Sequence, residues 1–205
     1  QGSIIPITIS VNDGVGFLFS ETKNIIIGNP NLLFSDDAEN GMLNWNTDRW
    51  GLSPMSFEGN FSFSDSPQGE YVGNWGISEM VLNNPLDFSD VSDGFLQIAV
   101  KWAIEDGWDW AQILGSVDNQ NWISLEGEYM SNGSGQGVQA LDEFGYDGES
   151  DWVIDNIPLI QFSGYNEVYL KFKISSDEYV TDDGIYIDNI NIFTYNNISP
   201  SLGDV

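Results

Sequence analysis

The segment ISSDEYVTDDGIYIDNINIFTY, residues 174–195, ends in the pattern of a half-buried β-strand. Ile185, Ile187, Ile190 and Ile192 are separated by polar residues, and a period of two places alternate side chains on one face of a strand. The spacing slips by one residue between Ile187 and Ile190. The sequence therefore predicts a strand with a β-bulge at this point.

An acidic turn, Thr181–Gly184, precedes that strand. Gly184 accommodates the positive φ of a tight turn because it has no Cβ. Carboxylates flank the turn and recur in the strand, and oxygen ligands crowded in this way suit a hard cation such as Ca²⁺. A solvated hairpin tip on an acidic protein explains the same residues, so the segment alone leaves both interpretations open.

The charge of the chain restricts its partners. The 205 residues include 5 Lys and Arg against 32 Asp and Glu, a formal net charge of −27, while 41% hydrophobic residues indicate a globular chain with a core. Such a charge excludes nucleic acid and anionic membranes as favourable partners. No apolar run is long enough to cross a bilayer, so we expect no membrane insertion.

The residue inventory also limits the chemistry. The sequence contains no Cys and no His, which removes disulfides, thiolate catalysis, His-based zinc sites and Ser-His-Asp triads. A carboxylate pair is still available, but accidental pairs are common among 32 acidic residues. We therefore expect no enzymatic activity from this chain.

The N-terminal part, residues 1–29, predicts a β arm. Ile5, Ile7 and Ile9 alternate, and Asn12–Gly14 is a strong tight-turn signal before further strand-like residues. The piece is too small to hold a core of its own. It is either the remnant of an immunoglobulin-like domain or an arm that pairs with the main body or with another molecule.

The main body, residues 30–196, predicts an all-β sandwich. A second acidic turn, Ser35–Gly41, precedes a series of short strands with turn signals between them, and no helix of useful length is indicated. Residues 197–205 lose the periodicity and are interpreted as a linker.

Two tryptophans flank an acidic residue in the predicted turn Glu105–Trp110. An exposed Trp108 or Trp110 could stack on a sugar face or on a partner side chain. Ordinary packing is the competing interpretation.

Five segments together resemble a known family. They are LLFSDDAENGMLNW, WGLSPMSFEGNFSFSDSPQGEY, WDWAQILGSVDNQNWISLEG, YDGESDWVIDNIPL and VTDDGIYIDNINIF. Their order is that of the jelly-roll β-sandwich domain found C-terminal to secreted bacterial zinc carboxypeptidases and immune-inhibitor-A-type peptidases, distantly similar to MAM and proprotein-convertase P domains. The resemblance covers residues 31–195 and implies an extracellular, non-catalytic accessory domain that often binds Ca²⁺. Asn189 stands where the family often has a second Asp, and Ile185 where Trp is frequent.

The resemblance places the acidic turn Ser35–Gly41 near the terminal strand. Carboxylates gathered from distant segments repel each other unless a cation lies between them, so a bound Ca²⁺ would link the two ends of the fold. The expected donors are Asp36, Asp37, Glu39, Asp65, Asp183 and Asp188.

These observations support three hypotheses about function. The first is a secreted or cell-surface, calcium-stabilised module for adhesion, anchoring or substrate positioning in a secreted hydrolase. The second is a structural subunit of an extracellular filament or surface assembly that self-associates through its N-terminal strand by β-strand addition. The third is a carbohydrate-binding module. A glycan or a protein surface is therefore the expected partner.

Overall fold

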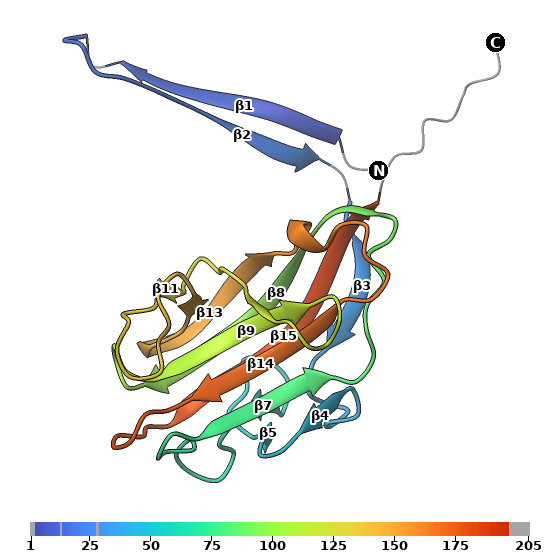
Figure 1. Cartoon of the computed structure of the whole chain (residues 1–205). Coiled ribbons are helices and arrows are strands. Elements are labelled where there is room, and N and C mark those ends of the chain that lie inside the picture. Colours follow the sequence, from blue (N-terminus) through green and yellow to red (C-terminus); the bar gives the residue numbers. More distant parts are fainter. Residues whose placement is uncertain (1–2, 13, 28, 197–205) are drawn as a thin grey trace, which may run out of the picture.

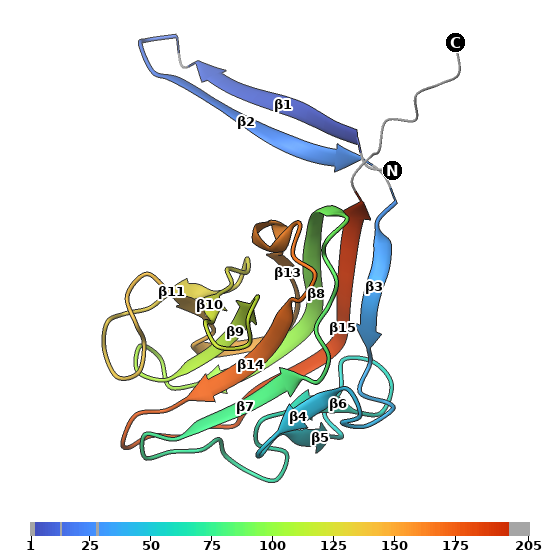
Figure 2. The ribbon, with the colours of Figure 1, turned by 45° about the vertical axis from the view of Figure 1, so that its right-hand side comes forward.

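Two antiparallel sheets face each other in this chain (Figures 1 and 2). The computed structural model describes residues 3–12, 14–27 and 29–196. The first sheet has the strand order β10 (Ile123–Ser124), β9 (Trp110–Ser116), β14 (Tyr169–Ser175), β7 (Ile77–Leu82) and β4 (Trp45–Thr47). The second has the order β13 (Gly148–Pro158), β8 (Val91–Ile104), β15 (Gly184–Asn196), β6 (Ser62–Ser64) and β5 (Gly51–Ser53), with β3 (Asn31–Asp36) also paired to β15.

The other described elements of residues 29–196 are small. They are the pair β11 (Ser131–Asn132) and β12 (Phe144–Gly145), and a single 3-10 turn, η1 (Ile160–Phe162). No described helix is long and apolar enough to cross a membrane. The predicted all-β jelly-roll sandwich is thereby confirmed.

The core lies between the two sheets because the strands alternate apolar and polar residues. The central strand β8 buries Leu96, Ile98 and Val100. Trp45 links the sheets, since its ring meets the ring of Phe63 at 5.8 Å and that of Phe172 at 5.5 Å. Edge-to-face ring pairs of this kind add to the burial of apolar area.

Strand β15 is central to the second sheet, as its alternation predicted. It pairs with β8, β6 and β3. Its register against β8 shifts between Asp188 and Asn191, and Asn189 has a φ of 48°. The predicted bulge is confirmed, and so is the positive φ of Gly184, at 92°.

The N-terminal residues form an antiparallel hairpin of β1 (Ser3–Asn12) and β2 (Leu18–Ile27), a two-stranded sheet that extends away from the sandwich in both views (Figures 1 and 2). On one face, hydroxyl pairs cross between the strands: Thr8 with Thr22 at 2.7 Å and Ser10 with Ser20 at 3.1 Å. The other face exposes Ile7, Ile9, Val11 and Phe19. The predicted linker, residues 197–205, lies outside the described residues.

Candidate functional site: a carboxylate cluster beneath exposed aromatics

Three carboxylates meet at the end of the sandwich away from the hairpin (Figure 1). Glu105 and Asp109 lie in the loop between β8 and β9, and Asp177 lies in the loop between β14 and β15. One ligand oxygen from each lies within 4.8 Å of the others. We call these three residues the acidic loop cluster.

Antiparallel pairing brings the cluster together, because Ser175 at the end of β14 lies opposite Trp110 at the start of β9. Asp109 is fully buried and accepts two hydrogen bonds. The Tyr71 hydroxyl donates to its Oδ2 at 2.6 Å, and the backbone N–H of Asp177 donates to its Oδ1 at 2.7 Å. The backbone N–H of Glu105 donates to the same tyrosine hydroxyl at 3.2 Å.

Burial and mutual repulsion disfavour the state in which all three carboxylates of the cluster are charged. Burial raises the pKa of Asp109, although its bonds to Tyr71 and to the Asp177 backbone oppose the shift. Burial also raises the pKa of Glu105, and the negative charges of Asp109 and Asp177 raise it further. The ion pairs described in the chain, Lys101–Asp151 and Lys171–Glu79, lie elsewhere. Three clustered oxygen donors of this type could hold a metal ion.

Three exposed aromatic residues are joined to the cluster by hydrogen bonds of their backbone N–H groups. Trp75, Trp108 and Tyr179 are 59%, 43% and 81% exposed. The N–H of Trp75 donates to the Asp177 carbonyl at 2.8 Å, and the N–H of Tyr179 donates to the Asp177 carboxylate at 3.2 Å. The N–H of Trp108 donates to the Glu105 carbonyl at 3.4 Å. The positions of the aromatic loops therefore depend on the cluster.

The backbone at Trp75 is strained. Asn74 and Trp75 have φ values of 59° and 58°, a left-handed conformation that is a clear outlier for a large side chain. Such residues cost about 1–2 kcal/mol each and concentrate at functional sites. Here the strained residue Trp75 is joined to the cluster by its backbone N–H, which donates to the Asp177 carbonyl.

The two tryptophans predicted to bind a ligand have different environments. Trp108 is exposed, as the stacking hypothesis requires. Trp110 is only 1% exposed, so the expectation that it presents a free face is wrong. It is the first residue of β9, and Gly145 packs so closely on its ring that an added Cβ would lie 2.9 Å from it. The covering segment is distant in sequence, which explains the error.

The six predicted calcium donors do not gather in one place. Asp65 lies beside Ile185, whose N–H donates to its Oδ1 at 2.8 Å. Asp188 is three residues further along β15, a separation of roughly 10 Å at the rise of a strand. One ion cannot contact both.

The first group lies at the bulge of β15. Asp188 is fully buried and accepts backbone N–H groups from Phe57 at 2.9 Å, Glu58 at 3.1 Å and Asn189 at 2.7 Å. Burial raises the pKa of Asp188, the three backbone hydrogen bonds oppose the shift, and the negative charge of Glu39 adds to it. We call Glu39 and Asp188 the bulge carboxylates.

Glu39 is exposed and also well supplied with donors. Its carboxylate accepts the N–H of Asn60 at 2.6 Å, the side-chain amide of Asn60 at 2.9 Å and the N–H of Phe61 at 2.9 Å, which together hold its pKa below its usual range. In the same turn, buried Asp36 accepts the indole N–H of Trp45 at 3.0 Å, and exposed Asp37 accepts a backbone N–H at 3.2 Å.

The second group is Asp65 with Asp183. Asp65 is 2% exposed, and its Oδ2 has no hydrogen-bond partner among the described residues. Burial raises the pKa of Asp65 to about 7, and the charge of Asp183 adds to the shift. The hydroxyl of Ser66 donates to the Asp183 carbonyl at 2.6 Å, which ties the segment after β6 to the turn before β15.

Comparisons of this chain with solved structures find likenesses at low sequence identity and at TM-scores below 0.5. No protein-family model matches it, and a search of curated proteins finds no similar sequence. A solved xylan-binding domain from CBM 22 aligns with 82% of this chain and 97% of its own length, at 14% identity and a TM-score of 0.48. The CBM22-1 xylan-binding domain from Paenibacillus barcinonensis Xyn10C aligns over 84% of this chain and 99% of its own, at 12% identity and a TM-score of 0.47.

A third solved structure is the K3 cleaved adhesin domain of Lys-gingipain from Porphyromonas gingivalis w83. It aligns with 80% of this chain and 99% of its own length, at 16% identity and a TM-score of 0.45. These likenesses concern the fold. The resemblance to carboxypeptidase-associated domains stays a prediction.

The acidic loop cluster was not predicted from the sequence. Its one local signal was Asp109, a carboxylate between two tryptophans at the start of a strand, where burial of a charge requires partners. Its partners Tyr71 and Asp177 lie 38 and 68 residues away and come together only in the folded sandwich.

Proposed function

We propose that this chain is a non-catalytic, extracellular binding module whose aromatic loops contact a glycan and are held in place by Ca²⁺. The supporting observation is that Trp75, Trp108 and Tyr179 are exposed on loops whose backbones bond to Glu105 and Asp177. A hard divalent cation between the three carboxylates would offset their repulsion and fix those loops.

Exposed indole and phenol rings suit a sugar ligand because their faces pack against the C–H face of a pyranose while their polar edges stay wet. The negative charge of the chain favours neutral or basic glycans over acidic ones. The module would thereby anchor a larger secreted protein to a polysaccharide or cell surface.

Titration of the full chain with a panel of neutral polysaccharides, with calcium and with chelator, tests this proposal. We expect binding that needs calcium. Its affinity should fall about tenfold or more in Trp108→Ala and in Trp75→Ala, because each change removes a ring that the bound ligand would cover. Tyr165→Ala is the matched control, because Tyr165 is 48% exposed but lies in the loop that follows η1. Binding that is unchanged in both tryptophan variants would disprove the role of this surface.

A second candidate function is assembly through the hairpin. Its face of Ile7, Ile9, Val11 and Phe19 is 43–57% exposed, and an isolated two-stranded ribbon is marginal in water. Light scattering across a salt and calcium series tests it, because screening weakens the repulsion between copies with a charge of −27. Assembly that grows with ionic strength and disappears when residues 1–28 are removed would support it. A strict monomer throughout would exclude it.

A further inference from the structure

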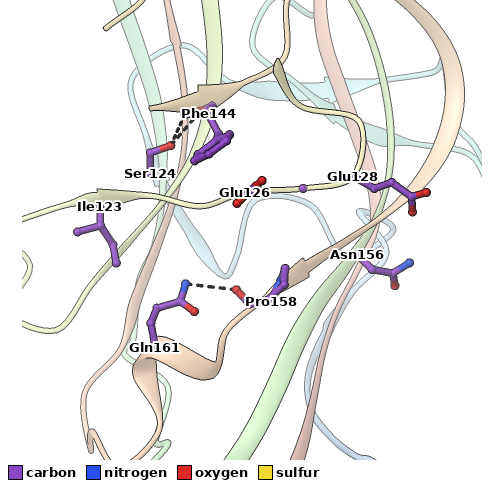
Figure 3. Close-up of a pocket in the computed structure, with 9 residues that line it drawn as sticks. Ile123, Ser124, Glu126, Glu128, Phe144, Asn156, Pro158 and Gln161 are labelled. Atoms are coloured by element: carbon purple, nitrogen blue, oxygen red, sulfur yellow. Dashed lines mark hydrogen bonds between the residues drawn. The ribbon is translucent and has the colours of Figure 1, made fainter. Parts of the chain in front are cut away.

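A pocket of about 550 Å³ opens between the edges of the two sheets (Figure 3). One wall is formed by β10 and the residues after it, and the opposite wall by the end of β13 and by η1. The pocket is separate from the acidic loop cluster and shares no residue with it. We call it the edge pocket.

Apolar side chains form part of its lining. Ile123, Phe144 and Pro158 lie around it, and the side chain of Ile123 is 49% exposed. Phe144 is fixed by its backbone, whose N–H donates to the Ser124 hydroxyl at 2.8 Å. The lining thus offers a positioned ring beside aliphatic surface.

Two amide side chains are oriented by hydrogen bonds to other protein groups. The Gln97 amide donates to Oδ1 of Asn156 at 2.9 Å, which leaves the Nδ2 of Asn156 as a donor for a ligand. Nε2 of Gln161 donates to the Pro158 carbonyl at 3.2 Å, which leaves its Oε1 as an acceptor (Figure 3). A pocket with one fixed donor and one fixed acceptor suits a polyhydroxylated ligand.

Two carboxylates on the pocket wall favour a positively charged ligand. Glu126 and Glu128 are exposed on the pocket wall, and within the described residues no protein donor contacts either carboxylate. Glu128 is held through its backbone, whose N–H donates to buried Asp155 at 2.8 Å. No Lys or Arg lines the pocket, so these two charges are free to meet a cation from outside.

We propose that the edge pocket binds an amino-sugar unit of a basic glycan, with Glu126 accepting a hydrogen bond from its ammonium group and Glu128 adding a second negative charge. The amides of Asn156 and Gln161 then bond to ring hydroxyls, and the ring of Phe144 packs on the sugar. A pocket of this volume accommodates a small saccharide. This site would act beside the aromatic loops and does not depend on them.

Calorimetric titration of the full chain with a glucosamine disaccharide at about 0.15 M salt tests the proposal. We expect binding that falls roughly tenfold or more in the double variant Glu126→Gln/Glu128→Gln, because charge-assisted hydrogen bonds are lost. Asn156→Ala should weaken it less. Glu149→Gln, an exposed carboxylate on β13 outside the pocket, is the matched control and should leave affinity unchanged.

Two further ligands sharpen the result. The N-acetylated disaccharide lacks the ammonium and should bind about tenfold more weakly. Spermidine carries the charge without hydroxyls, and equal binding of spermidine at this pocket would overturn the assignment of a sugar. Retained affinity in the double variant would overturn the site itself. Trp108→Ala should leave this binding intact, so failure of the proposed aromatic surface and failure of this pocket are separate outcomes.

Discussion

The bulge carboxylates and the acidic loop cluster look alike in sequence and differ in their partners. At the bulge, Glu39 and Asp188 each accept three N–H hydrogen bonds. In the cluster, Asp109 has two donors, and burial together with the charges of Asp109 and Asp177 raises the pKa of Glu105. Backbone dipoles thus offset part of the cost of burying Asp188 and lower the pKa of Glu39, whereas the second group would benefit more from a cation. The number of carboxylates in a turn therefore does not locate a metal site.

The largest expected effect is the loss of the Asp188 carboxylate. Asp188→Ala leaves three backbone N–H groups without their acceptor, which should lower the free energy of unfolding by roughly 3–6 kcal/mol. Denaturant unfolding measures it. Asp37→Ala is the control, because exposed Asp37 accepts one backbone bond of 3.2 Å and should change stability by about 0.5 kcal/mol or less. Equal losses in both variants would contradict the role given to the donors.

Asp65 is intermediate between the bulge carboxylates and the acidic loop cluster in its number of hydrogen-bond donors. One of its carboxylate oxygens accepts hydrogen bonds, and the other has no partner among the described residues. Its folded pKa of about 7 exceeds an unfolded value of about 3.9, so the folded state binds the proton more tightly. This stabilisation is complete below about pH 4 and is lost as pH rises through about 7. We expect the stability of the protein relative to Asp65→Asn to fall by roughly 3 kcal/mol across that window.

Unfolding measured at several pH values checks this effect, and the other carboxylates cancel in the difference between the two proteins. Asp183→Asn should move the window to lower pH, because the charge of Asp183 raises the pKa of Asp65. A flat difference between pH 4 and 8 would show that Asp65 is not protonated in the folded chain.

The effect of calcium on the free energy of unfolding tests whether the ion binds at the acidic loop cluster or at the bulge carboxylates. At 100 times its dissociation constant, a bound ion should raise the free energy of unfolding by about 2.7 kcal/mol. Asp109→Asn should abolish that rise, whereas Asp106→Asn, an exposed carboxylate in the same loop, should keep it. Glu39→Gln should keep it as well. If Glu39→Gln removes the calcium effect and Asp109→Asn does not, the ion lies at the bulge and the comparison fails.

Local patterns predicted the strands and the bulge, because both follow from side-chain alternation. The slip between Ile187 and Ile190 was visible in the sequence, and the structure places the register shift there. Gly184 likewise has the positive φ expected of its turn. Period and turn chemistry are local properties and need no knowledge of the rest of the fold.

The functional surfaces could not be predicted in the same way, because each joins segments distant in sequence. Asp109 is 68 residues from Asp177, and the edge pocket joins Glu126 to Gln161. The burial of Trp110 depends on the segment around Gly145 that covers it. The composition shows many carboxylates and aromatic residues. Which of these side chains lie close together depends on the register of the antiparallel strands.

The smallest expected effect concerns Asn189, which lies in the bulge with a φ of 48°. Gly adopts this conformation freely, so Asn189→Gly should be nearly neutral, whereas Asn189→Val should cost about 1–2 kcal/mol. Both changes are measured by denaturant unfolding.

Asn189→Asp, which restores the residue frequent in the resembling family, separates conformation from charge. Asn189 donates its side-chain amide to Glu58 at 3.2 Å, so a carboxylate here would replace an attractive contact with repulsion beside Asp188. We expect a loss of about 0.5–1 kcal/mol, consistent with a single exposed charge contact. Because the bulge carboxylates already have protein donors, calcium should not restore the lost stability. The contrary outcome is that calcium stabilises Asn189→Asp more than it stabilises the unchanged chain. In that case the bulge binds the ion once a further carboxylate is supplied. The hydrogen bonds to the bulge carboxylates would then be weaker than their distances indicate.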